Sequence, residues 1–203
     1  FLQKSGGYTF KNIDKNLSLA KRIEIQNFKK RTEMKVVALN SEVHKGLSYH
    51  QDELPNFPFA EIVASEAFFC DRDLAIVFTN DVVPKLLVLL GRNENLIIDK
   101  DYKGYVPAIM QNYPFTVAKV EDQTILCVDE DAPQLKGKGE KLFKKNEEPS
   151  DFLKNTITAI QNYNAELAAT QKALEEIKKA GILINKELTV SDNDKKITLI
   201  ISF

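Results

Sequence analysis

Residues 151–180, DFLKNTITAIQNYNAELAATQKALEEIKKA, decide the fold class of this chain. Mostly apolar side chains recur there at intervals of three and four residues, which places them on one stripe of an α-helix. They are Leu153, Ile157, Ile160, Tyr163, Leu167, Thr170, Leu174 and Ile177. Ser150 suits the capping position at the start, and Gly181 is the residue type that turns out of a helix. The polar residues Asn164 and Gln171 beside the stripe favour a helix packed over a sheet, about 45 Å long.

The sequence before and after this helix predicts short β-strands, because β-branched and aromatic residues cluster between turn residues. The predicted strands are 35–40, 74–79, 85–90, 95–98, 115–120, 124–128, 188–190 and 197–203. Residues 91–94 predict a tight hairpin between two of these strands. Residues 105–110 predict a short helix that begins through Pro107 and is stopped by Pro114.

Two stretches are harder to assign. Residues 60–69 fit either a strand or a helix, and residues 129–149 predict a charged loop with one helical turn at 140–143. All elements together predict an α+β fold: an antiparallel or mixed sheet covered by one long C-terminal helix, with an N-terminal arm.

Charge divides the chain into a basic arm and an acidic middle section. Residues 1–33 carry eight Lys or Arg against three acids, a net charge of +5, whereas residues 34–132 carry eight against sixteen, a net charge of −8. The arm is predicted to hold a short helix over 14–22 and a strand over 22–28, too little to bury a core by itself. Opposite charges favour docking of the arm on the middle section, within one chain or between two copies. The acidic middle section argues against nucleic-acid binding.

The composition, with 43% hydrophobic and 28% charged residues over 203 positions, is that of a globular protein. The longest aliphatic run, Leu86–Leu90, is too short to cross a bilayer, so we predict no membrane span. Cys70 and Cys127 lie among apolar residues and are predicted to be buried free thiols. Residues 1–4 show no recognisable signal peptide, which leaves a cytoplasmic and a cell-surface location both open.

Three groups of reactive side chains suggest chemistry, and each has a simpler interpretation. The acidic run Asp129–Asp131 could ligate a divalent cation, but no second cluster has ligand spacing, which favours a solvated turn. His44 and His50 are six residues apart and share no helical face, which favours structural or surface roles. Cys70 would need a base such as His44 and an electropositive setting, and acidic residues flank it. We therefore predict no catalytic residue, no metal site and no cofactor.

An ordered series of short motifs follows from residue 84 onward. The motifs are Pro84–Gly91 (PKLLVLLG), Glu94–Leu96 (ENL), Tyr105–Ala108 (YVPA), Tyr113–Phe115 (YPF), Leu126–Asp129 (LCVD), Gly139–Phe143 (GEKLF) and Glu148–Ser150 (EPS). This series, with the helix that carries Thr170 and Leu174, resembles the SapC family over residues 34–190. These bacterial proteins are named for an operon that serves a surface-array (S-layer) protein, and no catalytic activity is established for them.

Two features differ from the family pattern. Gln111-Asn112 stands where the family usually has basic residues before the Tyr-Pro-Phe element. The family also continues beyond the point that matches Phe203. The resemblance therefore implies that residues 34–203 are a SapC-like domain without the C-terminal part of the pattern, to which the arm 1–33 is added. We expect the arm to cover an exposed sheet edge.

The resemblance implies an accessory or binding protein for surface-layer assembly or export, which acts by contact with another polypeptide and without catalysis. The candidate binding residues are Tyr105, Pro107, Gln111, Tyr113, Phe115 and Asp129. Their rings could wall a groove or serve as core scaffolding, and both interpretations stay open. The alternative function is a small-molecule-binding or modifying enzyme with a pocket near residues 105–115. A further possibility is a homo-oligomer that forms through residues 1–33.

Overall fold

The computed structural model describes residues 35–51, 54–91, 95–99, 101–120, 123–192 and 195–202. The predictions for the arm, including the helix over 14–22 and the strand over 22–28, lie outside the described residues. None of the helices in the described part of the chain has the length and hydrophobicity that a bilayer crossing requires.

The largest sheet has five strands in the order β3-β5-β4-β10-β9, and all neighbours are antiparallel. The strands are β3 (Phe59–Glu61), β5 (Leu86–Leu89), β4 (Ala75–Thr79), β10 (Lys195–Ser202) and β9 (Asn185–Asp192). Strands β9 and β10 contain the two strands predicted at 188–190 and 197–203 and pair with each other, and β10 meets β4 at Ile201 and Ser202.

Two smaller sheets also lie in the described part of the chain. One contains β1 (Val36–Ala38), β7 (Gln123–Asp129) and β6 (Phe115–Val120) in the order β1-β7-β6, and the other pairs β2 (Ser48–Tyr49) with β8 (Glu140–Lys141). The helices are α2 (Ser41–His44), α3 (Ala64–Cys70), α4 (Ala108–Gln111) and α5 (Asp151–Lys179), with 3-10 turns η1 (Leu96–Ile98) and η2 (Pro133–Leu135). Antiparallel sheets with one long C-terminal helix confirm the predicted α+β fold.

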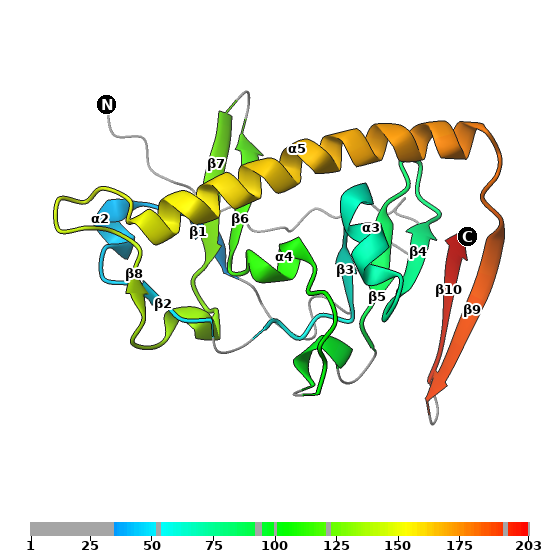
Figure 1. Ribbon diagram of the computed structural model, residues 1–203, viewed down its shortest axis with the longest axis horizontal. Helices are drawn as coiled ribbons and strands as arrows, with labels where there is room; N and C mark the ends of the chain where they lie inside the picture. The colour runs from blue at the N-terminus through cyan, green and yellow to red at the C-terminus, as the bar shows by residue number, and fades with distance from the viewer. Residues whose placement is uncertain are drawn as a thin grey trace. The chain divides into compact units, whose positions relative to one another are not determined.

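Helix α5 forms as its sequence pattern predicts. The Ser150 hydroxyl accepts a hydrogen bond from the amide of Leu153 at 3.2 Å, and Gly181 leaves the helix with a φ of 67°. In Figure 1 the helix, coloured yellow to orange, crosses β6 and β7 and continues to α3 and β4.

One stripe of α5 belongs to two apolar clusters. Leu153 and Ile160 pack in one cluster with Tyr49, Phe115, residues of β7 and the two residues that follow β8. Leu174 packs in a second cluster with residues of β3, α3 and β5. Between them, the Tyr163 hydroxyl donates to the Glu61 carbonyl at 3.0 Å. The helix is therefore the element that the two clusters share.

The predicted hairpin over residues 85–98 is wrong, because only its first half is a strand. Strand β5 pairs with β3 on one side and β4 on the other, so both of its edges are occupied. Residues 96–98 form η1 instead. The Asn95 side chain accepts a hydrogen bond from the Ile97 amide at 2.9 Å, which caps a helical turn.

The helical turn predicted at 140–143 is also wrong. Glu140 and Lys141 form β8, which pairs with β2, and Leu142 and Phe143 are buried in the same cluster as Leu153. The ambiguous stretch 60–69 contains both elements: β3 ends at Glu61 and α3 begins at Ala64. The short helix α4 follows Pro107 and ends before Pro114, as predicted.

Gly139 allows β2 and β8 to approach, and this contact gives a stability prediction. A Cβ atom at position 139 would lie 2.0 Å from the backbone oxygen of Tyr49, whereas a Cβ at Gly46 would meet nothing within 4 Å. We expect Gly139→Ala to lower the free energy of unfolding by about 2 kcal/mol, because one of the two backbones must shift. Gly46→Ala is the control, expected to change it by less than about 1 kcal/mol.

Urea unfolding of both variants checks this expectation. Equal stabilities for the two variants would show that β2 and β8 do not lie this close.

Candidate binding site

A buried carboxylate, Glu66, organises the region around α3 and α4. The Glu66 side chain is only 4% exposed and accepts three hydrogen bonds. They come from the amide of Val63 at 2.9 Å, the amide of Ala108 at 2.7 Å and the hydroxyl of Tyr105 at 3.0 Å. Two of these donors are free amides at the first turns of α3 and α4, so one carboxylate caps both helices.

Two phenylalanines of α3 face away from this core. Glu66 and Cys70 lie one turn apart and are both buried, and Ala67 packs against the same core, so Phe68 and Phe69 are left on the outer face of the helix. Phe68 is 85% exposed and Phe69 57% exposed. The Phe69 ring stacks on Tyr105 with centroids 5.4 Å apart, and Phe68 meets Phe69 edge to face at 5.8 Å. Phe68, Phe69 and Tyr105 form what we call the aromatic surface.

Tyr105 also borders an open cavity of about 460 Å³. The other residues that line the cavity are Gln51, Leu54, Gly104, Val106 and Gln111. The Tyr102 hydroxyl donates to the Tyr105 carbonyl at 2.9 Å and so fixes the loop that carries Gly104. Burial, then the charge of Glu66 and the hydrogen bond to it, raise the pKa of Tyr105, so its hydroxyl stays protonated. The aromatic surface and the cavity therefore share one ordered ring.

The six candidate residues divide among three environments. Tyr105 and Gln111 meet at the cavity, where the Gln111 amide donates to the Val106 carbonyl. Pro107 is fully buried at the start of α4, and Phe115 is buried against the rings of Tyr49 and Phe152. Neither of these two borders the cavity.

Tyr113 and Asp129 meet at a different place. The Tyr113 hydroxyl donates to Asp129 at 2.8 Å, and the other carboxylate oxygen of Asp129 accepts from the amides of Lys35 at 3.0 Å and Asp131 at 3.2 Å. Burial and the bond to Asp129 raise the pKa of Tyr113. The side chain of Asp129 is buried. Because it accepts from the Lys35 amide, it joins the start of β1 to the end of β7.

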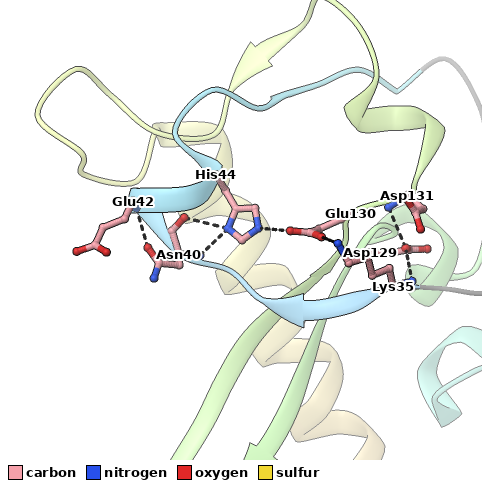
Figure 2. A network of polar contacts seen from close by, with 7 residues as sticks. All are labelled: Lys35, Asn40, Glu42, His44, Asp129, Glu130 and Asp131. Carbon is pink, nitrogen blue, oxygen red and sulfur yellow. Dashed lines mark hydrogen bonds and ion pairs between the residues drawn. The ribbon is translucent and has the colours of Figure 1, made fainter. Parts of the chain in front are cut away.

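Glu130 extends this arrangement into the network that Figure 2 shows. Its carboxylate lies 2.6 Å from the Lys35 ammonium and 3.0 Å from Nε2 of His44, which is buried. A carboxylate at Nε2 requires a proton there, so in the neutral ring Nδ1 accepts from the Asn40 amide at 3.0 Å. The acidic run was predicted to be a solvated turn. For Asp129 and Glu130 this is wrong, because both carboxylates have structural partners.

The remaining candidates for chemistry also have defined surroundings. Burial and the charge of Glu66 raise the pKa of Cys70 to about 11, which disfavours the thiolate at neutral pH. Cys70 and Cys127 are buried free thiols, as predicted. Nε2 of His50 lies 3.1 Å from the Pro133 carbonyl. Among the described residues, no group of three His, Cys, Asp or Glu side chains is placed to hold a metal ion.

Sequence patterns alone do not single out Glu66, Phe68 or Phe69. A signal for the phenylalanines exists in Glu66-Ala67-Phe68-Phe69-Cys70: a short helix that buries positions 66 and 70 must expose position 68. The sequence of residues 60–69 fits a strand as well as a helix, and only a helix predicts this exposure. The hydrogen bonds that Ala108 and Tyr105 donate to Glu66 join residues about forty positions apart, so no local sequence pattern predicts them.

The fold and the site define a small antiparallel α+β protein with an ordered aromatic surface beside an open cavity. The SapC family model matches residues 39–202. The chain therefore belongs to the SapC family. The comparison with curated proteins and the comparison with solved structures find no match.

The Glu130 network yields a pH prediction. Hydrogen bonds from Lys35 and His44 lower the pKa of Glu130 below its usual 4.5. A carboxylate whose pKa is lowered in the folded state stabilises the protein at every pH above the usual pKa. This stabilisation is lost as the pH falls through the lowered pKa. Glu130→Gln should therefore reduce the free energy of unfolding by about 1 kcal/mol near pH 7 and by much less near pH 3.

Urea unfolding of wild type and variant at the two pH values measures the difference. Glu176→Gln is the control, because Glu176 pairs with Lys179 on the exposed face of α5, where an ion pair contributes little. A loss from Glu130→Gln that is equal at both pH values would contradict the proposed role of its charge.

Proposed function

We propose that this chain is a non-enzymatic binding protein that serves bacterial surface-layer assembly or export and acts by contact with another polypeptide. Membership of the SapC family supports the link to surface-layer biology, since that is what the family's name and operon imply. The geometry of α3 and of the cavity supports contact through a defined surface.

The single observation that carries the proposal is the exposure of two adjacent phenylalanines on an ordered helix. Burial of a phenylalanine side chain contributes about 1.5–3 kcal/mol, which the folded chain forgoes at Phe68 and largely at Phe69. These rings are held in place, because Phe69 stacks on Tyr105 and Tyr105 is bonded to Glu66. Ordered aromatic side chains at the surface are typical anchors of protein–protein contacts.

The neighbouring cavity adds a second contact point for the same partner. Its volume of about 460 Å³ is in the range of pockets that accept a side chain or a small ligand. Leu54 and Val106 supply apolar walls, and Gln51 and Gln111 supply side-chain amides. An extended polypeptide that lies on the aromatic surface can place one side chain there, with Tyr105 shared by both contacts.

The aromatic surface predicts the effect of a double substitution. Affinity capture from the cells that make this chain should recover a surface-layer or secretion component with the wild type. Phe68→Ser with Phe69→Ser should reduce its recovery at least tenfold, since loss of two anchoring rings costs more than about 1.4 kcal/mol. Quantitative mass spectrometry of the captured proteins measures the ratio.

Val43→Ser is the matched control. Val43 is 70% exposed on a different helix, α2, so its loss should leave the capture unchanged. Recovery of the same proteins by the double variant, or the absence of any surface or secretion component, would refute the proposed function. Circular dichroism and urea unfolding of the double variant exclude misfolding as the cause of a loss.

The cavity favours a second candidate, a small-molecule-binding or modifying enzyme. Its lining combines the Tyr105 ring with two amides, a set that can orient a neutral ligand. Native mass spectrometry of the purified chain distinguishes the two functions. A bound metabolite that is lost in Gln111→Leu would favour this second function, whereas an unliganded mass together with capture of a surface component would favour the first.

A further inference from the structure

The rings of the aromatic surface present open faces to solvent. Phe68 meets Phe69 at an interplanar angle of 82°, an edge-to-face contact that leaves ring faces uncovered. Phe69 covers one face of Tyr105 at 26° and is itself more than half exposed. Ring faces carry the negative part of the aromatic quadrupole, so they attract cations.

A carboxylate lies beside these rings. The Ser65 hydroxyl, in the first turn of α3, donates a hydrogen bond to the carboxylate of Glu166 on α5. Ser65 is three and four residues before Phe68 and Phe69, so all three are neighbours on the surface of α3. The charge of Glu166 also contributes to the raised pKa of Tyr105. Glu166 is exposed, and its negative charge therefore borders the aromatic surface.

Other acids and ion pairs near the rings add to this negative potential or leave it unchanged. Arg72 pairs with Asp73 at 3.2 Å, which compensates its charge. Asp71, at the end of α3, is a further exposed acid. Glu66 contributes a buried carboxylate that accepts from three donors.

From this arrangement we propose that the aromatic surface binds an arginine side chain of the partner polypeptide. The guanidinium would stack on the more exposed ring, Phe68, beside Phe69, and donate to the carboxylate of Glu166. This inference rests on the proposed function and adds the chemistry of the partner. An acidic segment is disfavoured, because it would meet Glu166 and Asp71.

Arginine fits the surface better than lysine for a geometric reason. A planar guanidinium stacks on a ring and still presents N–H groups at its edge to a carboxylate. An ammonium makes one point contact and keeps a strong hydration shell, which it loses at a cost on an apolar surface. The flat rings with a carboxylate at their border match the first geometry.

Two synthetic peptides test the proposal on the full chain. One is acetyl-Gly-Leu-Arg-Leu-Gly-amide, and the other carries citrulline, which has the shape of arginine without its charge. We expect the arginine peptide to bind about tenfold more tightly, because a cation on aromatic rings with a nearby carboxylate contributes about that much. Two-dimensional NMR titration measures both affinities and reports whether the shifted signals include Phe68, Phe69 and Tyr105.

Matched variants separate this site from general attraction to an acidic protein. Glu166→Gln and the double variant Phe68→Ala with Phe69→Ala should each reduce the preference for arginine to less than about threefold. Glu176→Gln removes the same charge from the same helix, ten residues further along, and should leave the preference unchanged. Equal binding of the two peptides by the wild type, or a preference that survives in both test variants, would overturn the proposal.

The two proposals fail separately. If the serine double variant loses a surface-layer component but the peptides bind equally, the contact stands and the arginine specificity is wrong. If the serine variant captures the same proteins as wild type, the proposed function fails, whatever the peptides do.

Discussion

The buried carboxylate of Glu66 is the interaction on which the candidate site depends. Removing a carboxylate from water costs several kcal/mol, and here three hydrogen bonds from two amides and one hydroxyl offset that cost. Because these donors belong to α3, α4 and Tyr105, the bonds fix the three relative to one another. Phe68 and Phe69 follow directly on α3, so their outward direction is a consequence of where Glu66 is buried.

A comparable arrangement joins the β1-β7-β6 sheet to α2. Asp129 and Glu130 join β1, β7 and α2 through Lys35 and His44, and the Tyr113 hydroxyl completes the set. The ionisable groups Asp129, Glu130 and His44 are thus engaged in holding elements together.

The sequence predicted most of the fold, because most of its elements have local signals. The three-and-four spacing and the Ser150 cap predicted α5, and clusters of β-branched and aromatic residues predicted strands within β6, β7, β9 and β10. The strand predicted at 95–98 is wrong, because the Asn95 side chain caps a helical turn there despite the strand-like composition.

The candidate site was less accessible to sequence reasoning. Tyr105 belongs to a motif that resembles the family, whereas Gln111 stands where this sequence differs from the family pattern, and the structure places both at the cavity. Glu66 accepts one bond from nearby Val63, but its bonds from Tyr105 and Ala108 come from about forty residues away, so no local pattern identifies the carboxylate that α3 and α4 share. The most direct test of the account is a photo-crosslinking phenylalanine analogue at position 68 in the cells that make this chain, with position 43 as reference. The account predicts a covalent adduct with a surface-layer or secretion polypeptide at position 68 alone; adducts that are absent, or the same at both positions, would contradict it.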